Sequence, residues 1–106
     1  MSAWNSEEQR LNYHFEWDPA KALSNRSKHG VSFERAATVF RDPSQMSVPD
    51  DEHSDVEDRW ATIGMDELGN LLILIHTYRS ESADGTRIRI ISARTATRYE
   101  TRQYAE

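Results

Sequence analysis

Apolar residues concentrate in one stretch of this otherwise polar chain, residues 71–79, whose first five positions are all Leu or Ile. A second β-branched run covers 87–94, and a polar segment that contains glycine, 80–86, joins the two. Neighbouring runs of this kind predict an antiparallel strand pair. Because the first run is apolar on both faces, we expect it to be a central strand that is covered on both sides.

Two helices are predicted in the first half of the chain. Asp18 followed by Pro19 is typical of a helix start, and Gly30 is the residue expected after a helix end. Ser32 then caps a second helix, which Asp42-Pro43 ends. Its apolar residues recur at helical spacing and form one face: Phe33, Ala36, Ala37 and Phe40.

Shorter segments predict three more strands and a final helix. The strands are expected at 13–17, on an edge of the sheet, at 45–48 and at 59–65. The last helix begins at Thr95 or Thr97, and Thr97 with Glu100 matches a capping box. Tyr99 and Tyr104 are its only large apolar residues, so this helix should dock lightly on the sheet or be held by another chain.

These elements predict an α+β fold, a small antiparallel sheet with two N-terminal helices and a C-terminal helix. Residues 1–12 carry no pattern and are expected to form a flexible tail, which leaves 13–106 as a single domain. The chain has no cysteine, which excludes disulfides and thiolate metal sites. It has no apolar run of transmembrane length, and 1–12 lacks a signal-peptide core, so we expect a cytoplasmic protein without membrane contact.

Charge is distributed unevenly along the chain. The net charge is −5, but residues 1–49 are balanced, residues 50–75 carry eight acids and one arginine, and residues 76–106 have a net charge of +2. The basic residues are mostly arginine; only Lys21 and Lys28 are lysine. Arginine suits bidentate contacts to phosphate or carboxylate, although codon usage alone can also enrich it.

Several of these arginines should meet in space. In an antiparallel sheet, Arg79 at the end of the central run comes close to Arg59 and to residues 87–89, whereas Arg94 lies at the other end unless the final helix folds back. Arginines that face one groove are typical of a phosphate site. The alternative is that each arginine pairs with a nearby acid, for which the candidates are Glu57, Asp58, Glu81 and Asp84.

Other polar groups give weaker signals. His53, Asp55 and Glu57 would share one face of a strand and could hold a metal, but acid-rich segments usually face water, and we predict neither metal nor cofactor. Lys28 and His29 are either a cationic corner of an RNA groove or ordinary positive charge at a helix C-terminus. The chain has no GxGxxG, Walker, HExxH or nucleophile-elbow motif.

The order of these residues resembles the BrnT family of bacterial toxins over residues 13–104. The first half of the resemblance rests on Phe15-Glu16-Trp17-Asp18, Ala20-Lys21, Asn25, Lys28-His29-Gly30-Val31-Ser32-Phe33, Ala36, Val39-Phe40 and Asp42-Pro43. The second half rests on His53, Glu57, Arg59, Ile63-Gly64, His76-Thr77-Tyr78-Arg79 and Ile88-Arg89-Ile90-Ile91-Ser92-Ala93-Arg94.

The resemblance implies a RelE-like fold and an endoribonuclease that inhibits translation. It also implies a type II toxin–antitoxin pair. The partner would be a BrnA-type antitoxin with a ribbon-helix-helix domain. The toxin would bind operator DNA only through this antitoxin. The positions that it supports for catalysis are Lys28, His29, Glu57, Arg59, Arg79 and Arg94, and we add Arg87, Arg89 and Arg98 as RNA-binding candidates.

The chemistry of these residues fits RNA cleavage by the RNA's own 2′-hydroxyl. That reaction needs a base, an acid and positive charge near the phosphorane, and arginine supplies the charge without metal. The base or acid could be His29, Glu57, Lys28 or His53. A second hypothesis is a noncatalytic interaction module or co-repressor of the same fold, which the negative net charge favours.

Overall fold

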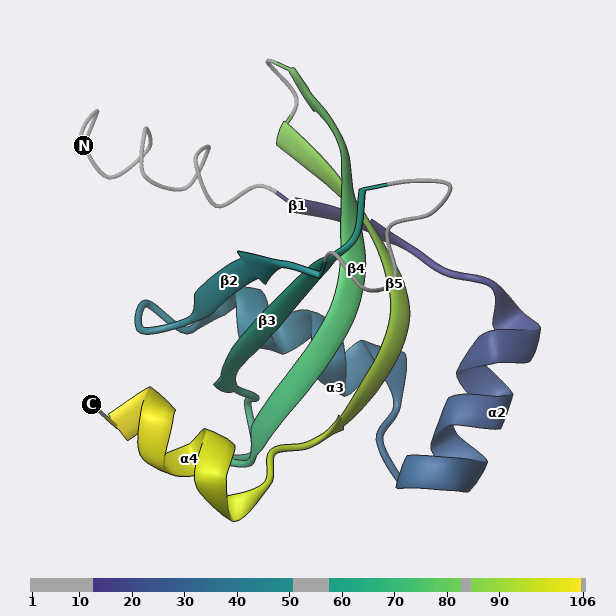
Figure 1. The fold of residues 1–106 in the computed structure, drawn as a ribbon. Helices are drawn as coiled ribbons and strands as arrows, with labels where there is room; N and C mark the ends of the chain where they lie inside the picture. Colours follow the sequence, from purple (N-terminus) through teal and green to yellow (C-terminus); the bar gives the residue numbers. More distant parts are fainter. Residues whose placement is uncertain (1–12, 51–57, 83–84, 106) are drawn as a thin grey trace.

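The computed structural model describes residues 13–50, 58–82 and 85–105, without the side chains of 79–82. They form one five-stranded sheet with helices on both faces (Figure 1). The elements are β1 (Tyr13–Glu16), α2 (Pro19–His29), α3 (Phe33–Ala37), the 3₁₀ helix η1 (Thr38–Arg41), β2 (Met46–Pro49), β3 (Trp60–Met65), β4 (Leu71–Ser82), β5 (Gly85–Thr95) and α4 (Arg98–Ala105). The predicted tail at 1–12 lies outside the described residues and stays a prediction. None of the described helices is long and apolar enough to cross a bilayer.

The predicted helix boundaries are confirmed by the cap geometry. The Asp18 side chain accepts a hydrogen bond from the Ala20 N–H at 2.9 Å, and Gly30 follows α2 in the left-handed conformation, with φ of 71°. The Ser32 side chain caps α3 by accepting from the Arg35 N–H at 3.1 Å. The second helix is shorter than expected, because the chain tightens into η1 after Ala37.

The sheet has the strand order β1-β5-β4-β3-β2, so β4 is its central strand, as predicted. The pairs β2–β3, β3–β4 and β4–β5 are antiparallel. The prediction of an antiparallel sheet is wrong for β1, which is an edge strand but pairs with β5 in parallel, with Phe15 opposite Ile88. No local turn sets this direction, because β1 and β5 are joined by the whole of the intervening chain. The α+β class is confirmed, with a mixed sheet.

The core lies on one face of the sheet, which we call the inner face. Leu72, Leu74 and His76 of β4 are completely buried there, and α3 and η1 cover them with Phe33 and Phe40 among the buried residues. Figure 1 shows α3 behind the sheet, whereas α4 lies in front of it near the lower end of β4. The opposite face, which we call the outer face, carries Ile73 and Ile75 and is only half-buried. The expectation that the central strand is covered on both sides is therefore wrong for the outer face.

Two buried polar side chains organise the inner layer. The amide of Asn25 in α2 donates to the carbonyl oxygens of Val31 and Ala93 at 3.0 and 2.8 Å, and its oxygen accepts from the Ala93 N–H at 3.1 Å. Asn25 thereby serves the edge of β5 as a short neighbouring strand would. On β4, His76 Nε2 lies 2.6 Å from the hydroxyl of Thr62, and burial lowers the pKa of His76 to about 4.

Candidate active site

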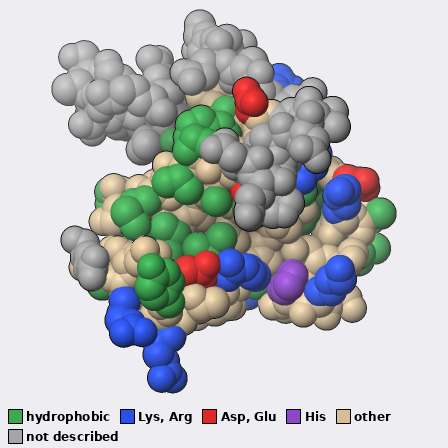
Figure 2. All heavy atoms as spheres, viewed as in Figure 1, with side chains coloured by type: hydrophobic (Ala, Val, Ile, Leu, Met, Phe, Trp, Pro, Cys, Tyr) green, Lys and Arg blue, Asp and Glu red, His purple; other side chains and the backbone are tan. Residues whose placement is uncertain are grey.

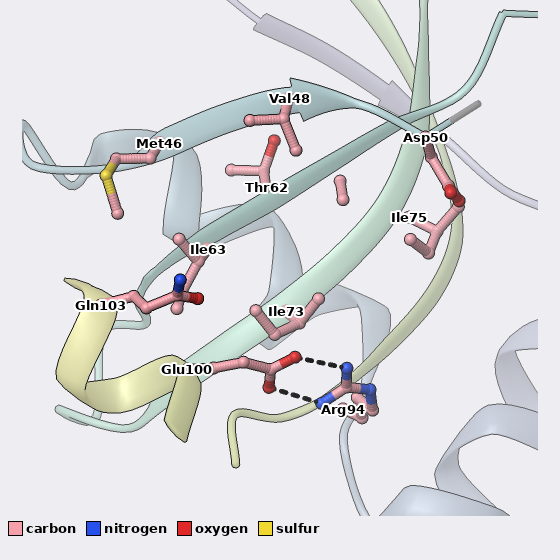
Figure 3. A pocket seen from close by; sticks show the side chains of 11 residues that line it. Met46, Val48, Asp50, Thr62, Ile63, Ile73, Ile75, Arg94, Glu100 and Gln103 are labelled. Carbon is pink, nitrogen blue, oxygen red and sulfur yellow. Dashed lines mark hydrogen bonds and ion pairs between the residues drawn. The ribbon is translucent and has the colours of Figure 1, made fainter. Parts of the chain in front are cut away.

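The outer face carries a pocket of about 570 Å³ between the sheet and α4 (Figure 3). Its floor is apolar and consists of Met46, Val48, Ala61, Ile63, Ile73 and Ile75, with Asp50, Thr62, Arg94, Glu100 and Gln103 completing the lining. Figure 2 shows hydrophobic side chains gathered on this face over β2, β3 and β4. The pocket thus joins an apolar floor to a charged end at α4.

Arg94 is the charged group at that end. It lies opposite Ile73 in the β4–β5 pairing, which places it on the outer face. Its Nη1 and Nη2 atoms donate to Oε1 and Oε2 of Glu100, both at 2.9 Å, and Nη1 also donates to the Thr95 carbonyl at 3.2 Å. The hydrogen bond with Arg94 is the main cause that lowers the pKa of Glu100 to about 2, and the same bond raises the pKa of Arg94.

Glu100 reaches Arg94 because α4 folds back over the end of the sheet. The predicted capping box is confirmed: the Thr97 N–H donates to Glu100 Oε1 at 2.8 Å, and the Glu100 N–H donates to the Thr97 hydroxyl at 3.1 Å. At the other end of α4, the Tyr104 hydroxyl donates to Asp42 Oδ2 at 2.5 Å. No residue of α4 is buried, so polar contacts hold this helix in place.

A second group of cations lies on the outer face at the opposite end of the sheet. Thr77 is paired with Arg89. Arg87 lies two residues before Arg89 on β5, so it is on the same face of the sheet. Arg59 directly precedes Trp60, which pairs with His76, so strand alternation places Arg59 beside Thr77. The prediction that Arg79 comes close to Arg59 and to residues 87–89 stays a prediction, because the side chain of Arg79 is outside the described part. The position of Arg94 at the far end of the sheet is confirmed.

Carboxylates lie next to Arg87 and Arg94. Arg87 Nη1 lies 3.7 Å from Glu16 Oε1 across the parallel β1–β5 pair, with both side chains well exposed. Arg94 is paired more tightly, with Glu100, a residue that was not among the predicted acidic partners. Exposed pairs at the longer distance contribute little to stability. Arg94 is thus paired tightly with an acid, and Arg87 is paired over a longer distance.

Lys28 and His29 lie in the last turn of α2, and both are exposed. They follow Asn25 by three and four residues, and Asn25 bonds to the backbone of Ala93, the neighbour of Arg94. The C-terminal half of α2 therefore lies along the part of β5 that carries Arg94.

The remaining candidates are less well placed. Arg98 is exposed at the start of α4. Arg79 lies on β4 next to an irregularity of the β4–β5 pairing, and its side chain is outside the described part. Glu57, His53 and Asp55 also lie outside the described residues. Within the described part of the chain, no three His, Asp or Glu side chains are grouped to hold a metal ion.

Comparison with known proteins decides the family. Residues 17–100 match the family model described as "Ribonuclease toxin, BrnT, of type II toxin-antitoxin system". The chain belongs to the BrnT family. The resemblance in the sequence is therefore confirmed, and the chain is a ribonuclease toxin of a type II toxin–antitoxin system.

Solved structures agree in fold. A crystal structure of the Brucella abortus ribonuclease toxin BrnT is similar to this BrnT-family chain, with a TM-score of 0.58 and 22% sequence identity. The match covers 81% of this chain and 97% of the Brucella chain. No curated protein matched the sequence. The wider RelE-like grouping stays an expectation.

Glu100 is the site residue that sequence reasoning missed as a functional group. Its only sequence signal was the Thr97–Glu100 capping box, which predicts a helix start and says nothing about Arg94. The contact with Arg94 arises because the turn at Ala96 brings α4 back across the end of β5. The Ala96 N–H donates to the Leu71 carbonyl at 2.9 Å, which ties this turn to the start of β4.

Proposed function

We propose that this BrnT-family toxin cleaves RNA on the outer face, with arginine side chains holding the phosphodiester and without a bound metal ion. Arg94 carries the proposal: its guanidinium stands at the end of an open apolar pocket and already holds an oxyanion in bidentate geometry. Carboxylate and phosphate are recognised by the same planar fork, so a group that binds Glu100 in this way is built to bind a phosphate.

The reaction that fits is transesterification by the adjacent 2′-hydroxyl. A base takes the 2′-hydroxyl proton, the 2′-oxygen forms a bond to phosphorus, and the bond to the 5′-oxygen breaks while an acid protonates that oxygen. The products are a 2′,3′-cyclic phosphate and a 5′-hydroxyl. The guanidinium of Arg94 would stabilise the charge that builds up on the phosphorane.

The other candidates are assigned by position. Lys28 and His29 are proposed to supply the base or acid, because α2 is bound through Asn25 to Ala93, the neighbour of Arg94. Arg59, Arg87 and Arg89 lie at the far end of the same face, where they would hold the flanking RNA backbone. Glu57, Arg79 and Arg98 remain candidates on the sequence alone: the first two for catalysis and the third for RNA binding. His76 is excluded as a surface base, because it is completely buried.

Cleavage of a labelled RNA by purified protein tests this proposal. Arg94→Ala is expected to lower the rate by two to three orders of magnitude, comparable with the loss of one transition-state donor, about 10²–10³. Arg102→Ala removes an exposed arginine from the adjacent helix α4 and is the matched control. Equal rates for the two variants would remove Arg94 from the active site.

We further propose a BrnA-type antitoxin with a ribbon-helix-helix domain as the protein partner, and inhibition of translation in the cytoplasm as the outcome. The type II class supports a protein antitoxin as the partner. Operator DNA would be bound only through this antitoxin. Induction of the toxin should arrest growth, and co-expression of the adjacent antitoxin gene should restore it.

The second candidate function is a noncatalytic interaction module or co-repressor. The occupation of Arg94 by Glu100 favours it, together with the net charge of −5, since both oppose RNA binding. This alternative predicts normal growth on induction of well-expressed toxin and no RNA cleavage by the purified protein.

A further inference from the structure

We propose that Glu100 is a built-in competitor of RNA at Arg94: its carboxylate occupies the guanidinium donors that an RNA phosphate takes, and RNA binding displaces it. This inference rests on the proposed function, which places an RNA phosphate at Arg94. It adds that α4 of the toxin lowers the toxin's own affinity for its substrate.

The geometry of the pair supports competition. Both terminal nitrogens of Arg94 are engaged by the two oxygens of one carboxylate at 2.9 Å, which is the end-on fork arrangement that phosphate also adopts. Figure 3 shows the pair at the edge of the open pocket. The Arg94 side chain is 41% exposed and that of Glu100 24%, so a ligand can reach the pair from solvent.

Electrostatics opposes a ternary arrangement. A phosphate bound to Arg94 would lie within a few ångströms of the Glu100 carboxylate, and two anions at that distance repel each other. Even the ordinary glutamate pKa of about 4.5, without the lowering by Arg94, keeps the carboxylate ionised near neutral pH, so it does not escape this repulsion by taking up a proton. The carboxylate must therefore move away when the phosphate arrives.

The structure also lets Glu100 move at low cost. When the carboxylate leaves Arg94 it also releases the Thr97 N–H, but the other half of the capping box, from the Glu100 N–H to the Thr97 hydroxyl, does not involve the carboxylate and can persist. α4 has no buried residue whose packing would be lost, and the Tyr104–Asp42 bond holds the far end of the helix. Rotation of one side chain is enough for the exchange.

A positioning role is the alternative for the same contact. In that case Glu100 would stay in place and orient Arg94, while RNA bound the side of the guanidinium that carries Nε. The two roles predict opposite signs for the loss of the carboxylate, because a competitor weakens RNA binding and a positioning residue strengthens it.

Glu100→Gln is the decisive variant. Glutamine keeps an oxygen for the Thr97 N–H and preserves the capping box, but it loses the charge that holds Arg94. Binding is measured by fluorescence anisotropy with a labelled 2′-O-methyl RNA, which cannot be cleaved. We expect binding about two- to fivefold tighter than wild type, the range of one exposed ion pair. Glu67→Gln, in the exposed turn before β4, makes the same change of net charge and should bind as wild type does.

Two further variants separate the contact from its charge. Glu100→Asp keeps the charge but shortens the reach to Arg94, so it should also bind RNA more tightly than wild type. In the Arg94→Ala background, Glu100→Gln should have no effect, because the competed group is gone.

Three outcomes would overturn the inference: Glu100→Gln binding RNA as wild type does or more weakly, the same gain in the Arg94→Ala background, or the same gain from Glu67→Gln. Failure of the proposed function is a separate result, in which wild-type protein does not cleave RNA at all. In that case the proposed competition is refuted together with the proposed function. If the wild type cleaves RNA but Glu100→Gln does not change RNA binding, only the proposed competition is refuted.

Discussion

The contact between α2 and the edge of β5 depends on one buried side chain, Asn25, and we predict its contribution to stability. Asn25 is 6% exposed and makes three hydrogen bonds to backbone groups of Val31 and Ala93. Each bond contributes about 0.5–1.5 kcal/mol net, so Asn25→Ala should lower the free energy of unfolding by about 1.5–4.5 kcal/mol. The loss of stability is near the upper end of this range if water does not reach the backbone groups that lose their partner.

Asn25→Asp is a sharper variant because it keeps the shape of the side chain. At pH 7 a carboxylate can still accept from the Ala93 N–H, but it cannot donate to the two carbonyl oxygens that the amide now serves. A buried charge would then face two acceptors. We expect Asn25→Asp to be at least as destabilised as Asn25→Ala.

Urea denaturation at pH 7 measures both variants. A fall in the midpoint at an unchanged m-value reports lost stability and not a change in the denatured state. Ser24→Ala, at the exposed neighbouring position of α2, should stay within about 0.5 kcal/mol of wild type. The reasoning is refuted if Asn25→Asp unfolds at the wild-type midpoint, since α2 would then be held to β5 by something other than this amide.

Three further predictions follow from the site and the core. Cleavage should persist in excess EDTA, since guanidinium groups would supply the positive charge; a loss that one divalent ion restores would turn attention to the acidic segment 50–58. His76 has a native pKa of about 4 against an ordinary 6.5, so the unfolded chain binds its proton first, and stability present above pH 6.5 should fall by about 2 kcal/mol from pH 7 to pH 5. A urea midpoint equally sensitive to pH in wild type and in His76→Gln would contradict this. Gly64→Ala should cost about 1–3 kcal/mol, because an added Cβ would lie 2.7 Å from Val39 Cγ1, and an unchanged midpoint would show that η1 yields easily.

Local signals in the sequence were sufficient for most of the elements. Asp18, Gly30 and Ser32 mark helix boundaries that the structure confirms, because capping depends on hydrogen bonds within one helical turn. Thr97 and Glu100 form the capping box for the same reason. The apolar run at 71–75 became the central strand, since a stretch this rich in Leu and Ile has no other place in a small sheet.

Contacts between segments that are distant in the sequence could not be predicted from these local signals. The parallel direction of β1 depends on packing with β5, which lies more than half the chain away. The bonds of Asn25 to Ala93 and of Tyr104 to Asp42 likewise join distant residues that no sequence spacing relates. The register of the strands did place Arg94 at the other end of the sheet from residues 87–89 as expected, because antiparallel pairing of neighbouring strands leaves little freedom.

The sequence by itself determined that this chain is an α+β member of the BrnT family and which arginines lie at which end of the sheet. Only the tertiary structure decided that Glu100 holds Arg94 and that one face of β4 remains half-open beneath α4. Hydrophobic periodicity shows which side chains favour burial. It does not show what covers them, because burial by a helix of the same chain and burial by a bound partner give the same pattern in the sequence.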